Sequence, residues 1–154
     1  IKAFSKISKK LNAKLVILGE GKLRPSLQGL ILELDLNDTV LLAGFTDNPY
    51  PWYLTADVYV LSSDWEGLPT VLIEALESGL PIVSTDCESG PKEILENGRY
   101  GKLVPMNDIT AMSNAITKSL SEYHDKEFLM RRARDFSIEN ISKQYLEYFG
   151  LIEE

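Results

Sequence analysis

The stretch SSDWEGLPTVLIEALESGLPIVSTD, residues 62–86, has the pattern of a helix placed between two strands. Gly79 can end this helix as its C′ residue, and Pro81 can begin the next strand because the first residue of a strand need not donate a hydrogen bond. We therefore predict a helix over about residues 69–78 and a strand that begins at Pro81. The apolar run DVYVLSS at residues 57–63 predicts the strand before the helix.

The same alternation continues over the rest of the chain. The pattern predicts further strands at residues 15–18, 39–45 and 101–105 and further helices at residues 25–34 and 51–56. It also predicts a short helix within residues 90–98 and a helix capped by Asp108 that runs to about residue 120. The run at residues 15–18 is apolar throughout, which is typical of a strand buried on both faces. Strands that alternate with helices at this spacing form βαβ units. The predicted fold class is α/β, with a Rossmann-like, doubly wound, mostly parallel sheet and helices on both faces, in a single domain over residues 1–154.

Both ends of the chain show helical spacing. The apolar residues of the N-terminal helix are Ile1, Phe4, Ile7 and Leu11. A final helix is capped by Ser137, and its predicted apolar face consists of Ile138, Ile141, Tyr145, Tyr148 and Phe149. The first helix has neither an initiator Met nor a capping residue before it, which favours a segment cut from a longer chain.

Composition argues against several classes of protein. A net charge of −7 over 154 residues disfavours binding to a nucleic-acid backbone, which depends on basic patches. One cysteine, Cys87, and one histidine, His124, cannot build a disulfide framework or a usual zinc site, so no metal and no cofactor is predicted. We expect Cys87 to be buried and His124 to be solvated. No apolar run approaches the roughly 18–20 residues that cross a bilayer, and we expect a cytoplasmic location.

The loop DWEGLP follows the strand at residues 57–63. In an open α/β sheet, ligands bind at the carboxyl ends of the strands, so this loop is predicted to lie in the ligand crevice. Gly67 allows a ligand to approach the backbone closely, and Pro69 suits the first helical turn. The amides near Leu68, Thr70 and Val71 can then bind an anion with help from the helix dipole. A phosphate or diphosphate is the predicted anion.

Two carboxylates, Glu66 and Glu74, lie on either side of this predicted anion site. Because like charges repel, they are expected to contact neutral hydroxyl groups next to the phosphate, and sugars supply such groups. Glu74 lies about 6 Å along the helix at about 1.5 Å per residue, with a side chain that leans back toward the N-terminus, so it can meet a ribose diol. Glu66 can hold the hydroxyls of a second sugar. The alternative is that each is a structural residue. A Glu in a first helical turn stabilises the helix by roughly 0.3–1 kcal/mol through its interaction with the helix dipole, without a ligand.

At these residues the sequence resembles a large family of retaining glycosyltransferases that build capsules, lipopolysaccharides and other glycans. The family signature is a Glu, seven residues and a second Glu, and here it stands as SDWEGLPTVLIEALESGLPIV. Other segments that resemble family landmarks are LVILGEGKLRPSL, VLLAGF, ADVYVLSS, GPKEILENGRYGKLVPMND and FSIENISKQYLEYF. The resemblance implies a GT-B architecture, in which this chain is the C-terminal, nucleotide-sugar-binding domain and the N-terminal acceptor domain is absent.

The resemblance also implies roles for particular residues. Glu66 would hold the donor sugar as the catalytic residue, and Glu74 would bind the ribose hydroxyls. The remaining donor-binding positions, for the diphosphate and the base, would be Gly67, Leu68, Pro69, Thr70, Val71, Gly44 and Phe45. Metal is usually not required in such enzymes.

Two features depart from the family pattern. The basic Arg and Lys that neutralise the diphosphate belong to a GR…KG loop that would precede residue 1. Lys22 and Arg24 are alternatives for this role, but they fit a solvated helix start better. The segment ESGPKEIL also replaces paired glycines found in many relatives, so the donor remains open. The GEG sequence at residues 19–21 is expected to be a tight turn near the crevice, because a third glycine of the dinucleotide fingerprint is absent.

The implied activity is retaining hexosyl transfer from a nucleotide-diphosphate sugar to a glycan or lipid-linked acceptor. A UDP-sugar is the first candidate for the donor. The chain alone is expected to be inactive. Peripheral association with the inner face of the membrane would occur through the absent half. Two alternatives remain: a non-catalytic scaffold that binds a sugar nucleotide, and a nucleotide-sugar epimerase of similar architecture.

Overall fold

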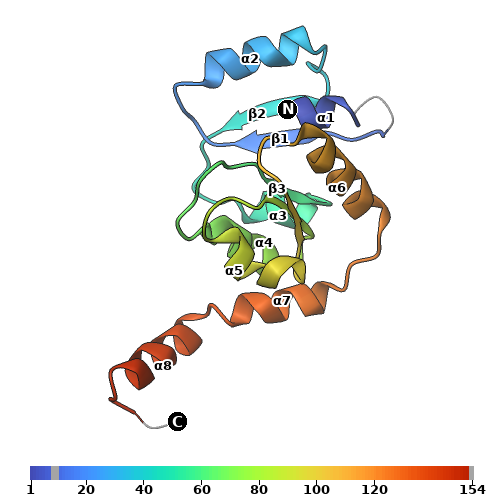
Figure 1. The fold of residues 1–154 in the computed structure, drawn as a ribbon. Helices are drawn as coiled ribbons and strands as arrows, with labels where there is room; N and C mark the ends of the chain where they lie inside the picture. The colour runs from blue at the N-terminus through green and yellow to red at the C-terminus, as the bar shows by residue number, and fades with distance from the viewer. Residues whose placement is uncertain (8–10, 153–154) are drawn as a thin grey trace.

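The computed structural model describes residues 1–7 and 11–152, and strands alternate with helices along the chain (Figure 1). The strands are β1 (Leu15–Leu18), β2 (Val40–Gly44), β3 (Tyr59–Leu61), β4 (Ile82–Thr85) and β5 (Lys102–Val104). The helices are α1 (Lys2–Ser5), α2 (Arg24–Glu33), α3 (Tyr50–Thr55), α4 (Thr70–Glu77), α5 (Pro91–Ile94), α6 (Ile109–Ser121), α7 (Lys126–Arg134) and α8 (Ile138–Tyr148), with a 3₁₀ turn at Glu96–Gly98. The predicted α/β class is confirmed.

The strands form two parallel sheets rather than the single sheet that the sequence predicts. β1 pairs with β2, and β3, β4 and β5 pair in that order. No backbone ladder joins β1 to β3 within the described residues. Both sheets nevertheless contribute side chains to one hydrophobic cluster, in which Ile17 of β1 and Val60 of β3 pack with the buried Val83 of β4. The two sheets therefore lie in one layer of the molecule.

Helices cover both faces of the three-stranded sheet. One face carries the cluster of Ile17, Val60 and Val83, which also includes buried residues of α1, α2 and α6: Phe4, Ile31, Met112 and Ile116. The other face packs against α4 and α7, whose buried residues include Leu72, Ala75, Leu76, Leu129 and Ala133. Burying a Leu side chain contributes roughly 1.5–3 kcal/mol, so the second of these clusters fixes α4 and its first turn against the sheet.

The prediction that β1 is buried on both faces is wrong. Val16 of β1 is 37% exposed and Leu41 of β2 is 53% exposed. The neighbouring Ile17 and Val40 point to the opposite face and join the cluster under α1 and α6, as alternation along a strand requires. The described helices thus cover only one face of the β1–β2 sheet, and the apolar run at residues 15–18 does not reveal this.

The predicted helix ends agree with the structure where they can be compared. The amides of Gly79 and Leu80 donate to the carbonyls of Leu76 and Ala75 at 2.9 Å each, and Gly79 has φ +67°, which is a Schellman end for α4. The side chains of Asp108 and Ser137 accept amide hydrogens at the starts of α6 and α8.

The two terminal helices differ from the pattern in their extent and burial. α1 ends at Ser5, and the predicted helix over residues 8–10 lies outside the described residues. α8 extends away from the body (Figure 1), and most of its predicted apolar face is exposed, with Ile138 at 82%, while Ile141 is half-buried. No helix in the described part of the chain is long and apolar enough to cross a membrane.

Candidate functional site

The loop after β3 holds Glu66 in a defined position at the carboxyl end of the sheet. The Ser63 hydroxyl donates to the Glu66 carboxylate at 2.6 Å, and the Ser89 hydroxyl donates to the Glu66 carbonyl at 2.9 Å. The Thr85 hydroxyl at the end of β4 donates to the Ser63 carbonyl, which ties the loop to the neighbouring strand. Glu66 is half-buried, so one carboxylate oxygen is oriented while the group remains accessible.

Gly90, which was not predicted as a site residue, packs against this loop. A Cβ atom at Gly90 would lie 2.5 Å from Cδ of Pro69 and 2.7 Å from the carbonyl oxygen of Gly67. Gly90 also has φ +80°, a conformation that other residues rarely adopt. The glycine is therefore required by both backbone conformation and space. The available signal in the sequence was the Gly90–Pro91 pair, in which Gly90 is the N-cap of α5 and Pro91 its first residue.

Gly90→Ala is expected to lower the free energy of unfolding by about 1–3 kcal/mol, because it adds the strain of a left-handed residue and a contact with the Gly67–Pro69 turn. Denaturant unfolding of the full-length protein measures this loss. Gly98→Ala is the matched control, since Gly98 has φ +96° with no atom within 4 Å of an added Cβ. An equal loss in both variants would mean that contact with the turn contributes nothing.

The start of α4 offers backbone amides at the predicted anion site. Pro69 is the N-cap residue, and no side chain caps this end of the helix. The amides of Leu68 and Val71 have no acceptor among the described residues. The prediction that the Thr70 amide is free is wrong, because it donates to the Leu68 carbonyl at 2.9 Å in a turn closed by Pro69. Two donors and the positive end of the α4 dipole therefore remain available to an anion.

Glu74 lies one turn into α4 and is oriented by an aromatic residue that was not predicted to belong to the site. The Tyr53 hydroxyl of α3 donates to Glu74 Oε2 at 3.0 Å. Glu74 is half-buried, and neither it nor Glu66 forms an ion pair within residues 1–7 and 11–152. Among the described residues, the side-chain partners of these two carboxylates are the neutral hydroxyls of Tyr53 and Ser63.

Tyr59 of β3 lies close enough to both acids for their charges to affect its pKa. Burial, with the negative charges of Glu74 and Glu66 in support, raises the pKa of Tyr59 to about 12. Burial and the nearby Glu74 also raise the pKa of Tyr53, whose ring meets that of Tyr59 edge to face at 5.6 Å between centroids. Both carboxylates therefore act on the same tyrosine, and Tyr53 and Tyr59 form an aromatic support next to Glu74.

The residues predicted to lie by a base are at the end of β2. Gly44 is buried with φ +81°, its carbonyl accepts the Gly19 amide at 2.7 Å, and Phe45 is 73% exposed. The GEG segment, predicted to be a tight turn near the crevice, thus lies next to the carboxyl end of β2. No hydrogen bond in the described part of the chain joins Phe45 to the loop that carries Glu66. Arg24 forms an ion pair with Glu20 and is exposed, in agreement with a solvated helix start.

The two tryptophans of the chain, Trp52 and Trp65, are both exposed. Trp65 is 73% exposed and bridges to Glu88 through the backbone beside Glu66, whereas Trp52 lies on α3. Trp65 is therefore a surface residue of the crevice loop. Cys87 is buried, as predicted.

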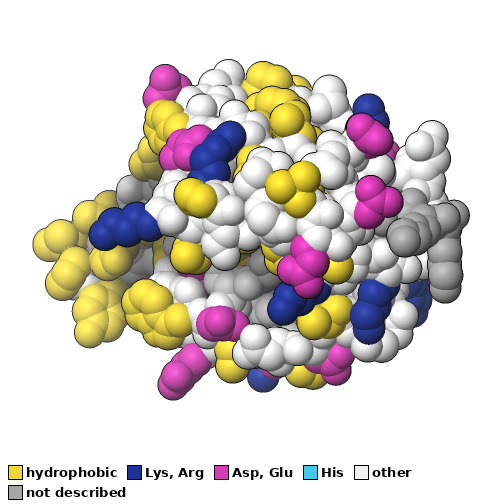
Figure 2. Space-filling view, turned by 90° about the horizontal axis from the view of Figure 1, so that it is seen from above, with side chains coloured by type: hydrophobic (Ala, Val, Ile, Leu, Met, Phe, Trp, Pro, Cys, Tyr) yellow, Lys and Arg dark blue, Asp and Glu magenta, His cyan; other side chains and the backbone are white. Residues whose placement is uncertain are grey.

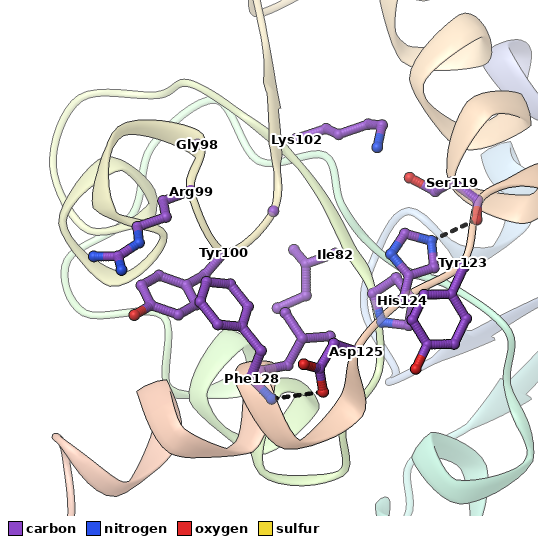
Figure 3. A pocket seen from close by; sticks show the side chains of 13 residues that line it. Ile82, Gly98, Arg99, Tyr100, Lys102, Ser119, Tyr123, His124, Asp125 and Phe128 are labelled. Carbon is purple, nitrogen blue, oxygen red and sulfur yellow. Dashed lines mark hydrogen bonds between the residues drawn. The ribbon is translucent and has the colours of Figure 1, made fainter.

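A cavity of about 250 Å³ lies away from both acids, at the amino ends of β4 and β5 (Figure 3). Tyr100 and Phe128 line one side of this cavity and His124 lines the other. The expectation that His124 is solvated is wrong: it is half-buried, and its Nε2 lies 2.7 Å from the Ser119 carbonyl oxygen. The chain turns back after α6, which brings the ring against the last turn of that helix.

Charges on one face of the molecule, and its metal-ligating residues, do not define a further site. The face shown in Figure 2 carries acidic and basic side chains interspersed among hydrophobic ones, without a continuous basic patch. Within the described ranges, no three His, Cys, Asp or Glu side chains lie together in a way that could hold a metal ion. The chemistry that the arrangement offers is therefore the binding of an anion at α4 and of hydroxyl groups at Glu66 and Glu74.

The fold defines an α/β protein in which the loop that carries Glu66 and the start of α4 lie at the carboxyl end of a parallel strand. The chain belongs to the group 1 glycosyltransferases, because the model of that family, described as glycosyl transferases group 1, matches residues 1–136.

Curated relatives agree with this family. The chain is 36% identical to an uncharacterized glycosyltransferase of Methanocaldococcus jannaschii, over 94% of this chain and 44% of the relative. It is 34% identical to an N-acetylgalactosaminyltransferase of Campylobacter jejuni that acts on a diphospho-undecaprenol acceptor, over 96% of this chain and 41% of the relative. The chain therefore spans less than half the length of these two relatives.

Solved structures resemble the chain over nearly its whole length. A mutant of TarM from S. aureus, crystallised with UDP, aligns with a TM-score of 0.85 at 25% identity over 96% of this chain and 31% of that protein. The pneumococcal O-GlcNAc transferase GtfA, crystallised with UDP and GlcNAc, aligns with a TM-score of 0.80 at 23% identity over 96% of this chain and 31% of that protein. These neighbours are GT-B glycosyltransferases, and the likeness shows the fold.

Proposed function

We propose that this chain is the donor-binding domain of a retaining glycosyltransferase that transfers a hexosyl group from a nucleotide-diphosphate sugar, with UDP as the first candidate nucleotide. The observation that carries the proposal is the pair Glu66 and Glu74, spaced as Glu, seven residues, Glu. Both acids are accessible, and within residues 1–7 and 11–152 neither forms an ion pair and the amides of Leu68 and Val71, which the acids flank, have no acceptor.

Each group has a proposed task. The amides of Leu68 and Val71 and the α4 dipole hold the diphosphate, which becomes more negative as the bond to the sugar breaks. Glu74, oriented by Tyr53, accepts hydrogen bonds from the ribose hydroxyls. Glu66, oriented by Ser63, accepts hydrogen bonds from the donor sugar and keeps its anomeric carbon in place. Attack from the front face, with the departing phosphate stabilised by the protein, retains the stereochemistry.

The proposed partners follow from the relatives. The Campylobacter jejuni relative acts on an undecaprenol-linked glycan, and the TarM and GtfA structures contain UDP. These names support a glycan or lipid-linked acceptor and a UDP-sugar donor. We further propose that a second, N-terminal domain carries the acceptor site and any peripheral attachment to the inner face of the membrane, in the cytoplasm, and that no metal takes part in the transfer.

A nucleotide screen on the full-length protein tests this function. A ligand at 100 times its Kd stabilises the folded state by about 2.7 kcal/mol, so the cognate nucleoside diphosphate should raise Tm by several degrees while the nucleoside alone has little effect. Sugar release from the matching nucleotide sugar should then require an acceptor. Binding without any transfer would favour a scaffold, and sugar conversion without an acceptor would favour an epimerase. Stabilisation by no nucleoside diphosphate would contradict the proposal.

A further inference from the structure

Two arginines meet at one aromatic ring at the edge of the sheet opposite to the loop that carries Glu66. Arg99 lies just before the amino end of β5, and Arg131 lies in the last turn of α7. Their guanidinium carbons lie 5.7 Å and 5.8 Å from the centre of the Phe128 ring. Phe128 in turn stacks on Tyr100, with 4.6 Å between the ring centroids (Figure 3). Two positive groups are therefore held next to one aromatic pair.

A hollow of about 190 Å³ opens at this arginine pair. It is lined by Arg99, Tyr100, Phe128, Arg131 and Asp135. The Asp135 carboxylate would repel an anion, but it is paired with Arg132 at 2.9 Å. Arg131 is exposed and forms no ion pair within residues 1–7 and 11–152. The hollow therefore presents a positive charge that the described residues do not neutralise.

The second arginine of the pair keeps most of its donors available. Arg99 uses Nη1 for an ion pair with Glu96 at 3.0 Å, and its guanidinium lies beside the Tyr100 ring (Figure 3). A guanidinium has five N–H donors in a planar fork, which matches the oxygens of a phosphate group. Because both forks rest on aromatic rings, part of the ordering that an anion would require is already in place.

The neighbouring Arg132 shows what a structural arginine looks like on the same helix. It is largely buried, and it donates to the carbonyls of Glu93 at 2.8 Å and Ile94 at 2.9 Å, which joins α7 to α5. Arg131 has no such acceptor among the described residues, and an exposed cation–π contact contributes little to stability. Packing therefore accounts for Arg132 but not for Arg131.

The charge of α7 favours an anion at this place. The helix carries four basic residues and one acidic residue, whereas the whole chain has a net charge of −7. The basic residues are Lys126, Arg131, Arg132 and Arg134. A local surplus of positive charge in an acidic protein attracts an anionic ligand to that surface.

We propose that a phosphate group binds in this hollow, between the guanidinium groups of Arg99 and Arg131. The rings of Phe128 and Tyr100 keep the two guanidiniums in place, and their free N–H groups donate to the phosphate oxygens. The phosphate group belongs either to a free phosphate or to the headgroup of an anionic phospholipid. The site is separate from the crevice of Glu66 and Glu74 and does not rest on the proposed donor-binding role.

NMR of the arginine side chains in the full-length protein tests the site. Inorganic phosphate replaces chloride at constant ionic strength, so that screening does not change. The Nε–H signals of Arg99 and Arg131 should shift together and saturate at millimolar phosphate. The signal of Arg134, which lies on the same helix and is paired with Glu127 at 2.9 Å, should not follow them.

Vesicles distinguish the two sources of the phosphate group. The full-length protein is sedimented with vesicles of phosphatidylcholine, with or without phosphatidylglycerol. A response to free phosphate without binding to the anionic vesicles supports a soluble ligand, and binding to the anionic vesicles that requires Arg131 supports a lipid headgroup. A protein that shows neither response would overturn the proposal.

Substitutions separate a site from general attraction by a basic helix. Arg131→Gln and Arg99→Gln should each weaken binding about tenfold or more, because each removes charge-assisted hydrogen bonds. Arg131→Lys should restore only part of the affinity, since Lys keeps the charge but not the planar fork. Arg134→Gln is the matched control and should change binding less than about threefold.

Equal losses in Arg131→Gln and Arg134→Gln would overturn the proposal, because they would show that only the total charge of α7 matters. Arg131→Gln is expected to fold normally, since its side chain is exposed and has no ion pair among the described residues. No measurement in this series contains nucleotide, so a failure of the donor-binding role would leave each outcome unchanged.

Discussion

Replacing Glu74 by Ala in the full-length protein should weaken the binding of UDP at least tenfold. Glu74 would accept hydrogen bonds from the ribose diol, and a hydrogen bond to a charged group contributes about 1.5–3 kcal/mol, where each 1.4 kcal/mol corresponds to a factor of ten in Kd. Isothermal titration calorimetry of the wild-type protein and the variant measures this difference. If GDP rather than UDP is the cognate nucleotide, the same loss should appear for GDP.

The matched control for this substitution is Glu77→Ala on the same helix. Glu77 is exposed and accepts the Tyr50 hydroxyl at 2.7 Å, so its removal changes the charge of α4 by the same amount as the removal of Glu74. We expect Glu77→Ala to change the affinity by less than about threefold, because a screened surface charge contributes little. Unchanged UDP affinity in Glu74→Ala, or equal losses in both variants, would show that Glu74 has no specific role at the ribose.

Replacing Glu66 by Ala should lower kcat/KM for the nucleotide sugar by about 10- to 100-fold while the affinity for UDP changes little. The reason is that Glu66 is assigned to the donor sugar, a group that UDP lacks. The substitution therefore removes a charge-assisted hydrogen bond of about 1.5–3 kcal/mol to that sugar. Steady-state transfer to the acceptor and calorimetry with UDP give the two quantities separately.

Asp64→Asn provides the control for Glu66. Asp64 is an exposed acid two residues earlier in the same loop, and its substitution should leave transfer within about threefold of the wild type. A Glu66→Ala protein with wild-type kcat/KM would exclude a role for this carboxylate in holding the donor sugar. A large loss of UDP affinity in Glu66→Ala would instead place Glu66 at the nucleotide.

The sequence predicts most elements of this fold for local reasons. Gly79 ends α4 and Asp108 begins α6 as predicted, because these signals depend only on the neighbouring backbone. The α/β class follows from the alternation of strands and helices. The exposure of Val16 and the division into two sheets were missed, since the burial of a strand depends on which helices cover each face and not on the strand itself.

The two acids of the candidate site could be predicted from the sequence, but the residues that hold them in position could not. Glu66 and Glu74 lie in one continuous motif, so sequence spacing alone brings them together. Tyr53 and Gly90 lie 21 and 16 positions from Glu74 and reach the site only through the packing of α3 and α5 against α4. The burial of His124 was missed for the same reason, because the sequence of a polar linker does not indicate how the chain turns back against α6.

The most direct test of the central claim is a crystal structure of the full-length protein with UDP bound. The claim predicts that the ribose hydroxyls lie within hydrogen-bonding distance of Glu74, and that the diphosphate oxygens contact the amides of Leu68 and Val71. A nucleotide bound elsewhere, or one whose ribose and diphosphate lie on other groups while Glu74 stays paired only with Tyr53, would contradict it.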